Sequence, residues 1–279
     1  MSKSLARAVL IGGTGFIGKA INHELSRIQV PVLSIASNFI NLLEPMAEYQ
    51  LRKVIKKTDS IVMLSALTPK WGKGPDIFTK NIHMLDVVLK VASDINVRHF
   101  IYFSSDAVYG IKEGLISESS SLNPVDLYGA MHLSRELMLA KISHIPTMIL
   151  RPTMVYGFGD THNAYGPNRF LNTSKIENEI ALFGEGEELR DYIAVEDVAK
   201  ITSLILQKKY NGILNLATGN SMTFKKIAEF IKANRNHPTL IKRMQRLNNI
   251  FHRQFDTTNL IKMFPSYQYK KLEDYLQSS

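Results

Sequence analysis

The stretch Gly12-Gly13-Thr14-Gly15-Phe16-Ile17-Gly18 decides the fold of this chain. It follows a short apolar run at residues 7–11. It opens a stretch, residues 17–28, in which isoleucine and leucine recur every three or four positions, as on one face of a helix. Glycines at positions 12, 15 and 18 allow a tight turn, close approach of the backbone to a pyrophosphate, and close packing of helix on strand. A plain glycine turn is the alternative, but the strand–turn–helix context favours a nucleotide-binding loop.

Short apolar runs alternate with helical patterns along the rest of the chain. Further strands are expected at residues 30–35, 60–64, 99–104, 147–150 and 213–217, and helices at 76–93, 128–142, 196–206 and 223–233. Buried strands that alternate with amphipathic helices predict an α/β fold with a Rossmann-type doubly wound parallel sheet. We expect this domain over residues 1–157, with 191–218 returning to it in part. Residues 158–279 are expected to form a smaller C-terminal substrate-binding lobe.

The composition excludes several classes of protein. The 279 residues are 45% hydrophobic and 21% charged, which rules out wholesale disorder, a fibrous repeat and a membrane bundle. There is no cysteine, hence no disulfide, no thiolate metal site and no cysteine nucleophile, and no metal is expected. No run resembles a signal peptide or a membrane span, so a cytoplasmic protein is expected. The formal net charge of +9 favours an anionic partner.

Several further segments follow the glycine loop in a characteristic order. They are Ser65-Ala66, Asn81, and residues 103–110, 128–132, 151–157, 184–193, 195–199, 215–219 and 256–260. Together with the glycine spacing they resemble the extended short-chain dehydrogenase/reductases, the NAD(P)-dependent nucleotide-sugar epimerases and dehydratases. The resemblance covers nearly the whole chain. It implies an NAD(P)-dependent epimerase or oxidoreductase that acts on a nucleotide-activated sugar, with a homodimer as the common assembly.

The resemblance assigns the catalytic residues. Tyr128 is the acid/base, Ser105 hydrogen-bonds the reacting oxygen, and Asn81 supports the helix and relay around the tyrosine. The family places a lysine four residues after the tyrosine, on the same helix face, where its charge favours phenolate. This chain has His132 there, which near pH 7 is largely neutral at its ordinary pKa. Either His132 is a weaker activator, or another cation replaces the lysine, or the chain is a non-catalytic NAD(P)-binding sensor or scaffold.

The resemblance also places the cofactor. The residues expected to contact it are Gly12, Thr14, Gly15, Phe16, Ile17, Gly18, Ser37, Ser65, Ala66, Ser104, Tyr128, His132, Pro152 and Val155. The choice between NAD and NADP is not encoded, because the second strand ends at residues 34–38 with neither an acid nor an arginine. In the family, an Asp-Leu pair that lines the adenine pocket follows the third strand. This pair is absent from residues 41–59, and we expect that the third strand is missing there as well.

Two absences narrow the reaction. Sugar dehydratases of the family have a glutamate where this chain has Ala107, so dehydration is disfavoured. The epimerase–reductases that make GDP-fucose use a cysteine, which this chain lacks. A 4-epimerase or a keto-sugar reductase remains, and reduction of a non-sugar carbonyl is a third alternative.

The substrate contacts remain open between two interpretations. Asp106 is a substrate contact or a turn residue, and Arg190 binds the substrate diphosphate or forms a surface ion pair with Asp191 or Glu188. The basic residues Lys242, Arg243, Arg246 and Arg253 serve the same diphosphate or are solvated. Nucleic acid is not an expected partner, because few aromatic residues interleave with these charges. A membrane is not expected either, because no run of the sequence approaches a membrane span.

Overall fold

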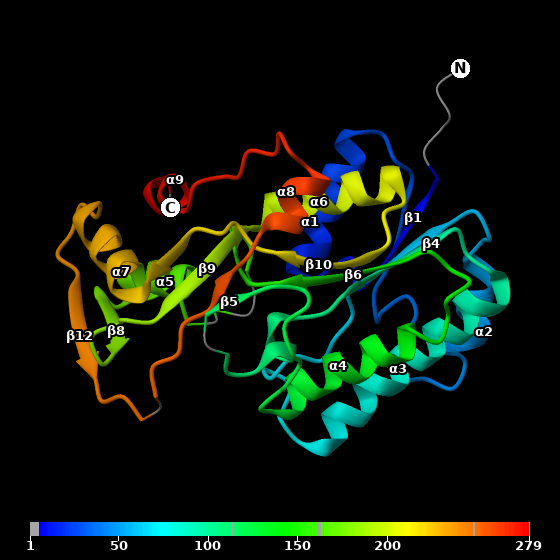
Figure 1. The fold of residues 1–279 in the computed structure, drawn as a ribbon, viewed down its shortest axis with the longest axis horizontal. Helices are drawn as coiled ribbons and strands as arrows, with labels where there is room; N and C mark the ends of the chain where they lie inside the picture. Colours follow the sequence, from blue (N-terminus) through cyan, green and yellow to red (C-terminus); the bar gives the residue numbers. More distant parts are fainter. Residues whose placement is uncertain (1–5, 113, 161–162, 164, 248, 279) are drawn as a thin grey trace. The chain divides into compact units, whose positions relative to one another are not determined.

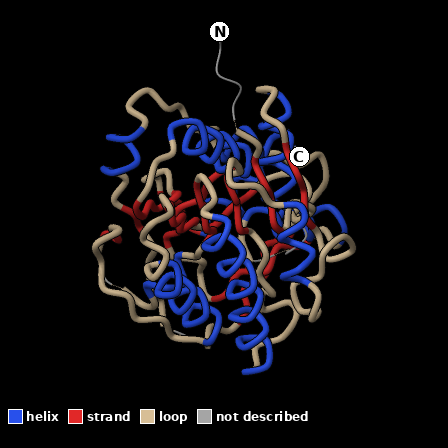
Figure 2. Tube along the Cα trace, turned by 90° about the vertical axis from the view of Figure 1, so that its right-hand side faces the viewer, coloured by secondary structure: helices blue, strands red, loops and turns tan. Residues whose placement is uncertain are grey.

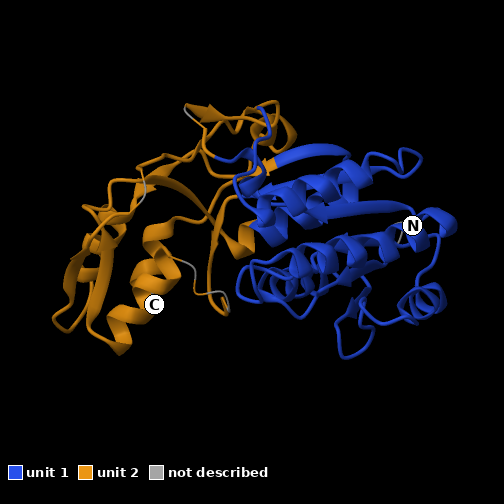
Figure 3. Ribbon diagram, turned by 90° about the horizontal axis from the view of Figure 1, so that it is seen from below, with its two compact units in different colours: residues 1–110, 121–152, 198–214 blue, residues 111–120, 153–197, 215–279 orange. Residues whose placement is uncertain are grey.

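A computed structural model describes residues 6–112, 114–160, 163, 165–247 and 249–278. The chain divides into two compact units (Figure 3). Unit 1 comprises residues 1–110, 121–152 and 198–214, and unit 2 comprises residues 111–120, 153–197 and 215–279. Each unit has a hydrophobic cluster of its own.

Unit 1 is built on a six-stranded sheet in the order β10-β6-β4-β3-β1-β2. The strands are β1 (Ala8–Ile11), β2 (Val32–Ile35), β3 (Ser60–Met63), β4 (His99–Phe103), β6 (Thr147–Pro152) and β10 (Gly212–Leu216). Neighbours from β2 through β6 pair in parallel, with Val9 beside Leu33 and Ile61. Every residue of β1, β3 and β4 is buried, as expected for strands covered on both faces. The predicted Rossmann-type sheet is confirmed.

Helices cover both faces of this sheet (Figures 1 and 2). Helices α1 (Phe16–Arg27) and α6 (Val195–Lys208) lie on one face, and α2 (Ala47–Val54), α3 (Pro75–Ile95) and α4 (Leu127–Leu139) on the other. Their apolar stripes explain this placement: α1 buries Ile21 and Leu25, and α3 buries Leu85, Val88 and Ala92 among others. The predicted helices are confirmed, with ends that differ by a few residues.

The edge beyond β2 lacks a strand, as expected. Residues 36–59 form turns and helix α2, and β2 is the last strand of the sheet. Ala47 and Leu51 of α2 are buried in the core of unit 1 together with Ile40. A short helix therefore covers the apolar surface at this edge, and the core stays closed without the missing strand.

Unit 2 is an assembly of small sheets and short helices. One sheet has the order β11-β9-β7, and β12 pairs with β8 and β13 with β5. The strands are β5 (Leu115–Ile116), β7 (Met154–Tyr156), β8 (Glu179–Phe183), β9 (Leu189–Ala194), β11 (Ser221–Thr223), β12 (Leu240–Met244) and β13 (Gln254–Phe255). The helices are α5 (Pro167–Ile176), α7 (Phe224–Ala233), α8 (Thr258–Met263) and α9 (Leu272–Ser278). Phe170, Ile180 and Phe224 belong to its core. Of the described helices, none has the length and apolarity to cross a bilayer.

The buried carboxylate of Asp59 is expected to stabilise the start of β3. It accepts hydrogen bonds from Arg7 Nε at 3.0 Å, Arg7 Nη2 at 2.6 Å and the Lys56 backbone N–H at 2.7 Å. Asp59→Ala removes the acceptor of these three bonds, and Arg7 Nη2 keeps only its bond to Val54 O. We therefore expect a loss of about 1–3 kcal/mol in the free energy of unfolding. Urea denaturation measures the loss. Glu48→Ala, which removes an exposed ion pair with Arg52, is the control and should leave the midpoint nearly unchanged. Equal losses in both variants would contradict the prediction.

Candidate active site

The glycine loop between β1 and α1 has no room for side chains at two of its three key positions. A Cβ on Gly12, whose φ is +92°, would lie 2.8 Å from Ser65 N, and one on Gly18 would lie 2.6 Å from the carbonyl oxygen of Gly12. A Cβ on Gly15 would meet nothing closer than 3.4 Å. Gly15 is exposed and caps α1 without a side-chain hydrogen bond. The first N–H groups of α1 therefore remain available to an anion.

The candidate residues of unit 1 gather where parallel strands end. The chain leaves β1 toward β2 on one side and returns through β3 on the other, so the loops after β1 and β3 adjoin at a topological switch point. Leu64 N and Ser65 N both donate to Ile11 O, at 2.8 and 3.0 Å. Ser65-Ala66 thus lies beside the glycine loop. Ser37 follows β2, Ser104 and Ser105 follow β4, and Pro152 ends β6. Val155 lies on β7 in unit 2.

The residues present fit a dinucleotide. Thr14 and Gly15 are exposed at the start of α1, where no side chain caps the helix. Phe16 and Ile17 therefore offer backbone N–H groups to a pyrophosphate. On α4, the Nε2 atom of His132 is buried without a hydrogen-bond partner, which is costly unless a ligand supplies one. Around Ser37, residues 36–39 carry no charged side chain, so these positions do not distinguish NAD from NADP.

Helix α4 presents Tyr128 to Ser105. Asp126 caps the helix by accepting from Gly129 N at 2.8 Å. A Cβ on Gly129 would lie 2.6 Å from Ala107 O, so the glycine lets α4 pack closely on the short helix η1 (Asp106–Tyr109). This packing brings Tyr128, at the start of α4, near Ser105, which precedes η1 and influences the phenol.

The electrostatics around Tyr128 favour the neutral phenol in the unliganded chain. Burial, and after it the carboxylate of Asp106, raises the pKa of Tyr128 to about 12. The hydrogen bond from Ser105 and the charge of Arg135 act in the opposite direction. Asp106 thus lies close enough to influence the phenol, whether it contacts a substrate or only begins the η1 turn.

His132 is buried inside the molecule, and its ring lies edge-on to Tyr128 with centroids 4.7 Å apart. Its Nδ1 atom is 2.7 Å from the hydroxyl of Tyr102 on β4. Burial, with the nearby charge of Arg135, lowers the pKa of His132 to about 3. The ring is therefore neutral near pH 7, more completely than its ordinary pKa predicts.

Arg135 is a buried cation that the sequence motifs did not single out. Its Nε donates to Asn81 O at 2.9 Å and its Nη1 to Ser65 O at 2.9 Å. Its Nη2 donates to the carbonyl and, at 3.3 Å, to the side-chain oxygen of Asn81. The charge of the guanidinium also acts on Tyr102, where it opposes the effect of burial on the pKa of that phenol. One signal pointed to it: Arg135 follows Tyr128 by seven positions and so lies on the same helix face.

Asn81 reaches the tyrosine helix through Arg135. The side chain of Asn81 accepts from Leu67 N at 2.8 Å and donates to Leu67 O and Ile77 O, each at 3.0 Å. It therefore holds the loop after β3, while its carbonyl receives the guanidinium. In its described contacts Asn81 is a positioning residue rather than a group beside the phenol.

A buried ion pair lies one position further along α4. Glu136 accepts from Arg151 Nε at 2.9 Å and Nη2 at 2.6 Å, and Arg151 Nη1 donates to the Tyr109 hydroxyl at 2.8 Å. Ser104 donates its hydroxyl hydrogen to Glu136 at 2.5 Å. The oxygen of Ser104 keeps capacity to accept from a ligand.

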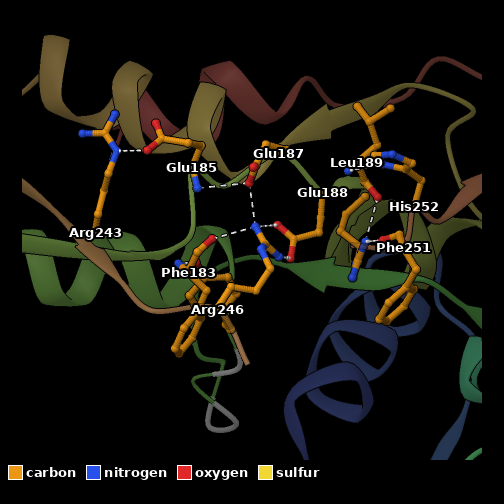
Figure 4. A network of polar contacts seen from close by, with 11 residues as sticks. Phe183, Glu185, Glu187, Glu188, Leu189, Arg243, Arg246, Phe251 and His252 are labelled. Carbon is orange, nitrogen blue, oxygen red and sulfur yellow. Dashed lines mark hydrogen bonds and ion pairs between the residues drawn. The ribbon is translucent and has the colours of Figure 1, made fainter. Parts of the chain in front are cut away.

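In unit 2, Arg190 is held by backbone and aromatic groups. Its Nη1 donates to Leu189 O at 2.9 Å and Phe251 O at 2.7 Å, and its guanidinium lies 4.6 Å from the Phe251 ring centre. The basic residues nearby face glutamates, and Lys242 pairs with Glu179. Figure 4 shows Arg243 paired with Glu185, and Arg246 with Glu187 and Glu188. These pairs neutralise much of the basic charge of the C-terminal region.

The sequence and fold identify the family. The model of the NAD dependent epimerase/dehydratase family matches residues 8–217, well over half of the chain. The chain belongs to this family. Membership confirms the resemblance to the extended short-chain dehydrogenase/reductases, an NAD(P)-dependent class of enzymes, and the cofactor class NAD(P) expected from the sequence.

Curated relatives and solved structures in the family agree with this placement. The chain is similar to a UDP-glucose 4-epimerase of Lactobacillus helveticus, 27% identical over 81% of each protein, and to an uncharacterized UDP-glucose epimerase of Bacillus subtilis (strain 168), 25% identical over 73% of each. The UDP-N-acetylglucosamine 4-epimerase from Methanobrevibacter ruminantium M1, in complex with UDP-N-acetylmuramic acid, superposes with a TM-score of 0.83 at 27% identity over 99% of this chain and 97% of that one. The ADP-L-glycero-D-manno-heptose-6-epimerase of Helicobacter pylori shares the fold, with a TM-score of 0.84 at 18% identity over 100% of this chain and 96% of that one.

Two glycine variants should separate folding from cofactor binding. Gly18→Ala forces a methyl group against Gly12 O and Gly13 Cα, 2.6 and 2.7 Å away, so we expect a lower unfolding midpoint and loss of NADH binding. Gly15→Ala has space in the folded chain and should keep the midpoint, but its methyl group faces the expected pyrophosphate and should weaken binding about tenfold or more. Thermal denaturation and NADH fluorescence titration measure the two effects. Undiminished NADH binding by Gly15→Ala would place the dinucleotide elsewhere.

The depressed pKa of His132 predicts a pH dependence of stability. The unfolded chain takes up a proton at this residue below pH 6.5, whereas the folded chain does so only near pH 3. His132 therefore stabilises the fold less as the pH falls through this window, by at most about 1.4 kcal/mol per pH unit. Urea denaturation at pH 7.5, 6 and 5 should show wild type losing stability faster than His132→Asn. Parallel losses would contradict a buried, neutral His132.

Proposed function

We propose that this chain is an NAD-dependent 4-epimerase of a UDP-hexose. The observation that carries the proposal is the close packing of α4 on η1, which places the hydroxyl-bearing residues Tyr128 and Ser105 near one another where β4 ends. These two residues lie near the carboxyl end of β4, in the same sheet in which the glycine loop follows the carboxyl end of β1. A phenol and a second hydroxyl at this end of the sheet can both hydrogen-bond the oxygen of a substrate alcohol next to a dinucleotide.

In this proposal Tyr128 holds and returns the proton of the sugar 4-hydroxyl, and Ser105 orients that oxygen by hydrogen bonding. Bound NAD supplies the acceptor and donor of a hydride. The charge of Arg135 opposes the effect of burial on the pKa of Tyr128 and so favours the phenolate that accepts the proton. His132 supplies a ring N–H to a hydroxyl of the nicotinamide ribose in place of the lysine of the family.

The choice of reaction and substrate rests on the relatives and on two sequence features. The relatives that are 25–27% identical are a UDP-glucose 4-epimerase, a UDP-glucose epimerase and a UDP-N-acetylglucosamine 4-epimerase. Ala107 occupies the position of the dehydratase glutamate, and the chain has no cysteine. Both features favour 4-epimerisation over dehydration, and epimerisation is proposed ahead of keto-sugar reduction.

The remaining site residues follow from the same proposal. Asp106 is proposed to contact the sugar, and Arg190, beside Phe251, to bind the diphosphate of the substrate. NAD is proposed over NADP, since the family is described by NAD. A cytoplasmic homodimer is the proposed form of the protein.

One observation favours a second candidate, a non-catalytic NAD(P)-binding sensor or scaffold. His132 is neutral, and Tyr128 keeps a raised pKa in the unliganded chain. An inactive relative that retains the cofactor would show the same features. Tight NADH binding without turnover of any UDP-, GDP- or dTDP-sugar would support this candidate over the epimerase.

The epimerase proposal predicts the behaviour of a tyrosine variant. Purified protein with added NAD should interconvert UDP-glucose and UDP-galactose, or their N-acetylated analogues, as followed by NMR of the sugar protons. Tyr128→Phe removes the proton carrier and should lower kcat by about 10²–10⁴-fold with intact NADH binding. Tyr49→Phe, an exposed tyrosine on α2, is the matched control and should retain activity. Wild-type turnover that survives Tyr128→Phe would overturn the assignment.

A further inference from the structure

Arg135 is a buried cation without a carboxylate partner among the described residues. Its hydrogen bonds go to the carbonyls of Asn81 and Ser65 and to the Asn81 amide oxygen. The neighbouring carboxylate, Glu136, is paired with Arg151. Burying an arginine against neutral groups alone is expensive. The charge of Arg135 is thus left uncompensated on the same helix face as Tyr128 and His132.

The hydrogen bonds of Tyr102 determine where the proton of His132 lies. The positive charge of Arg135 acts on Tyr102 and favours the orientation in which the hydroxyl hydrogen points away from the guanidinium. If Tyr102 then donates to His132 Nδ1, 2.7 Å away, the neutral ring carries its proton on Nε2. In the opposite arrangement, His132 Nδ1–H donates to Tyr102 Oη. The buried O–H of Tyr102 then lacks an acceptor, and Nε2 lacks a donor. The first arrangement leaves only one group unpaired, the Nε2–H.

We propose that Arg135 is a positioning residue which, together with His132, performs the two tasks of the lysine in the family motif. Tyr102, with its hydroxyl hydrogen turned away from the charge of Arg135, fixes His132 with the proton on Nε2, so that an N–H donor is available to the cofactor. Arg135 itself supplies the fixed positive charge on the helix face of Tyr128. The part of the inference that concerns catalysis rests on the proposed function, whereas the part that concerns His132 does not.

The other charged groups around Tyr128 make this charge necessary. Asp106 from η1 and Asp126 from the start of α4 both disfavour phenolate, and Ser105 supports it only by a hydrogen bond. The neutral His132 adds no charge of its own. Arg135 is the cation that acts on the phenol from α4, and its effect does not vanish near neutral pH because arginine remains protonated.

The test of the tautomer is 15N NMR of the histidine side chains, with no ligand present. The chain has eight histidines, so the His132 signals are assigned by their loss in His132→Asn. We expect a neutral ring with the proton on Nε2 and a hydrogen-bonded Nδ1 between pH 5 and 8. In Tyr102→Phe the Nδ1 signal should move toward that of an unbonded nitrogen. In Tyr109→Phe, a matched loss of another buried hydroxyl, it should stay in place.

Three results of this experiment would overturn the inference. They are a wild-type His132 that is charged at pH 7, one with its proton on Nδ1, and an Nδ1 signal that Tyr102→Phe leaves unchanged. None of them depends on turnover. If the protein converts no nucleotide sugar but His132 behaves as expected, the proposed function fails and the assignment of the tautomer stands.

The charge of Arg135 is tested by the pH profile of kcat/KM for Arg135→Gln and Arg135→Lys. Loss of the charge should lower kcat about tenfold near neutral pH, move the rising limb of the profile to higher pH and change KM little. Arg135→Lys keeps the charge and should restore the position of the limb. A limb that stays in place in a folded Arg135→Gln, with unchanged circular dichroism, would show that the charge does not act on Tyr128. If Arg135→Gln does not fold, Arg135→Lys is the test. A rising limb of its pH profile that is shifted from the wild-type position would contradict the role of the charge in the same way.

Discussion

The buried polar face of α4 is the constraint on which the site depends. His132, Arg135 and Glu136 all face the interior, and each must find a partner there because unpaired polar groups are costly away from water. Tyr102 on β4 meets His132, the carbonyls of Asn81 and Ser65 meet Arg135, and Arg151 on β6 meets Glu136. These partners come from separate elements of unit 1. They therefore fix α4 against the sheet and, with it, the position of Tyr128.

The topology of the sheet supplies the rest of the site. Because β1 and β3 are neighbours and their following loops adjoin, the glycine loop and the Ser65 loop meet at the carboxyl ends of these strands. The strand that is missing beyond β2 affects this site little, since β2 can end the sheet and α2 covers the apolar surface left open. Residues 36–39, directly after β2, carry no acid or arginine, so the chain has no charged side chain there to bind the adenosine ribose.

Much of the fold could be predicted from the sequence because its signals are local. The glycine loop, the apolar strands and the spacing of Ile17, Ile21 and Leu25 each specify one element, and the missing strand follows from the lack of an apolar run after residue 41. Arg135 and Glu136 could not be placed in this way. An arginine on a helix is usually solvated, and only the packing of α4 against β4 and α3 makes it a buried cation. Nor does the position of His132 after Tyr128 predict its contact with Tyr102, which is thirty residues away in sequence but adjacent in space.

A crystal structure of the chain with bound NAD would test the roles of Tyr128 and His132 together. We expect His132 Nε2 to donate to a ribose hydroxyl of the cofactor, with the Tyr128 hydroxyl beside the nicotinamide ring and Tyr102 still bonded to His132 Nδ1. A bound cofactor that leaves Nε2 without a partner, or a Tyr128 hydroxyl out of reach of the nicotinamide, would contradict these roles.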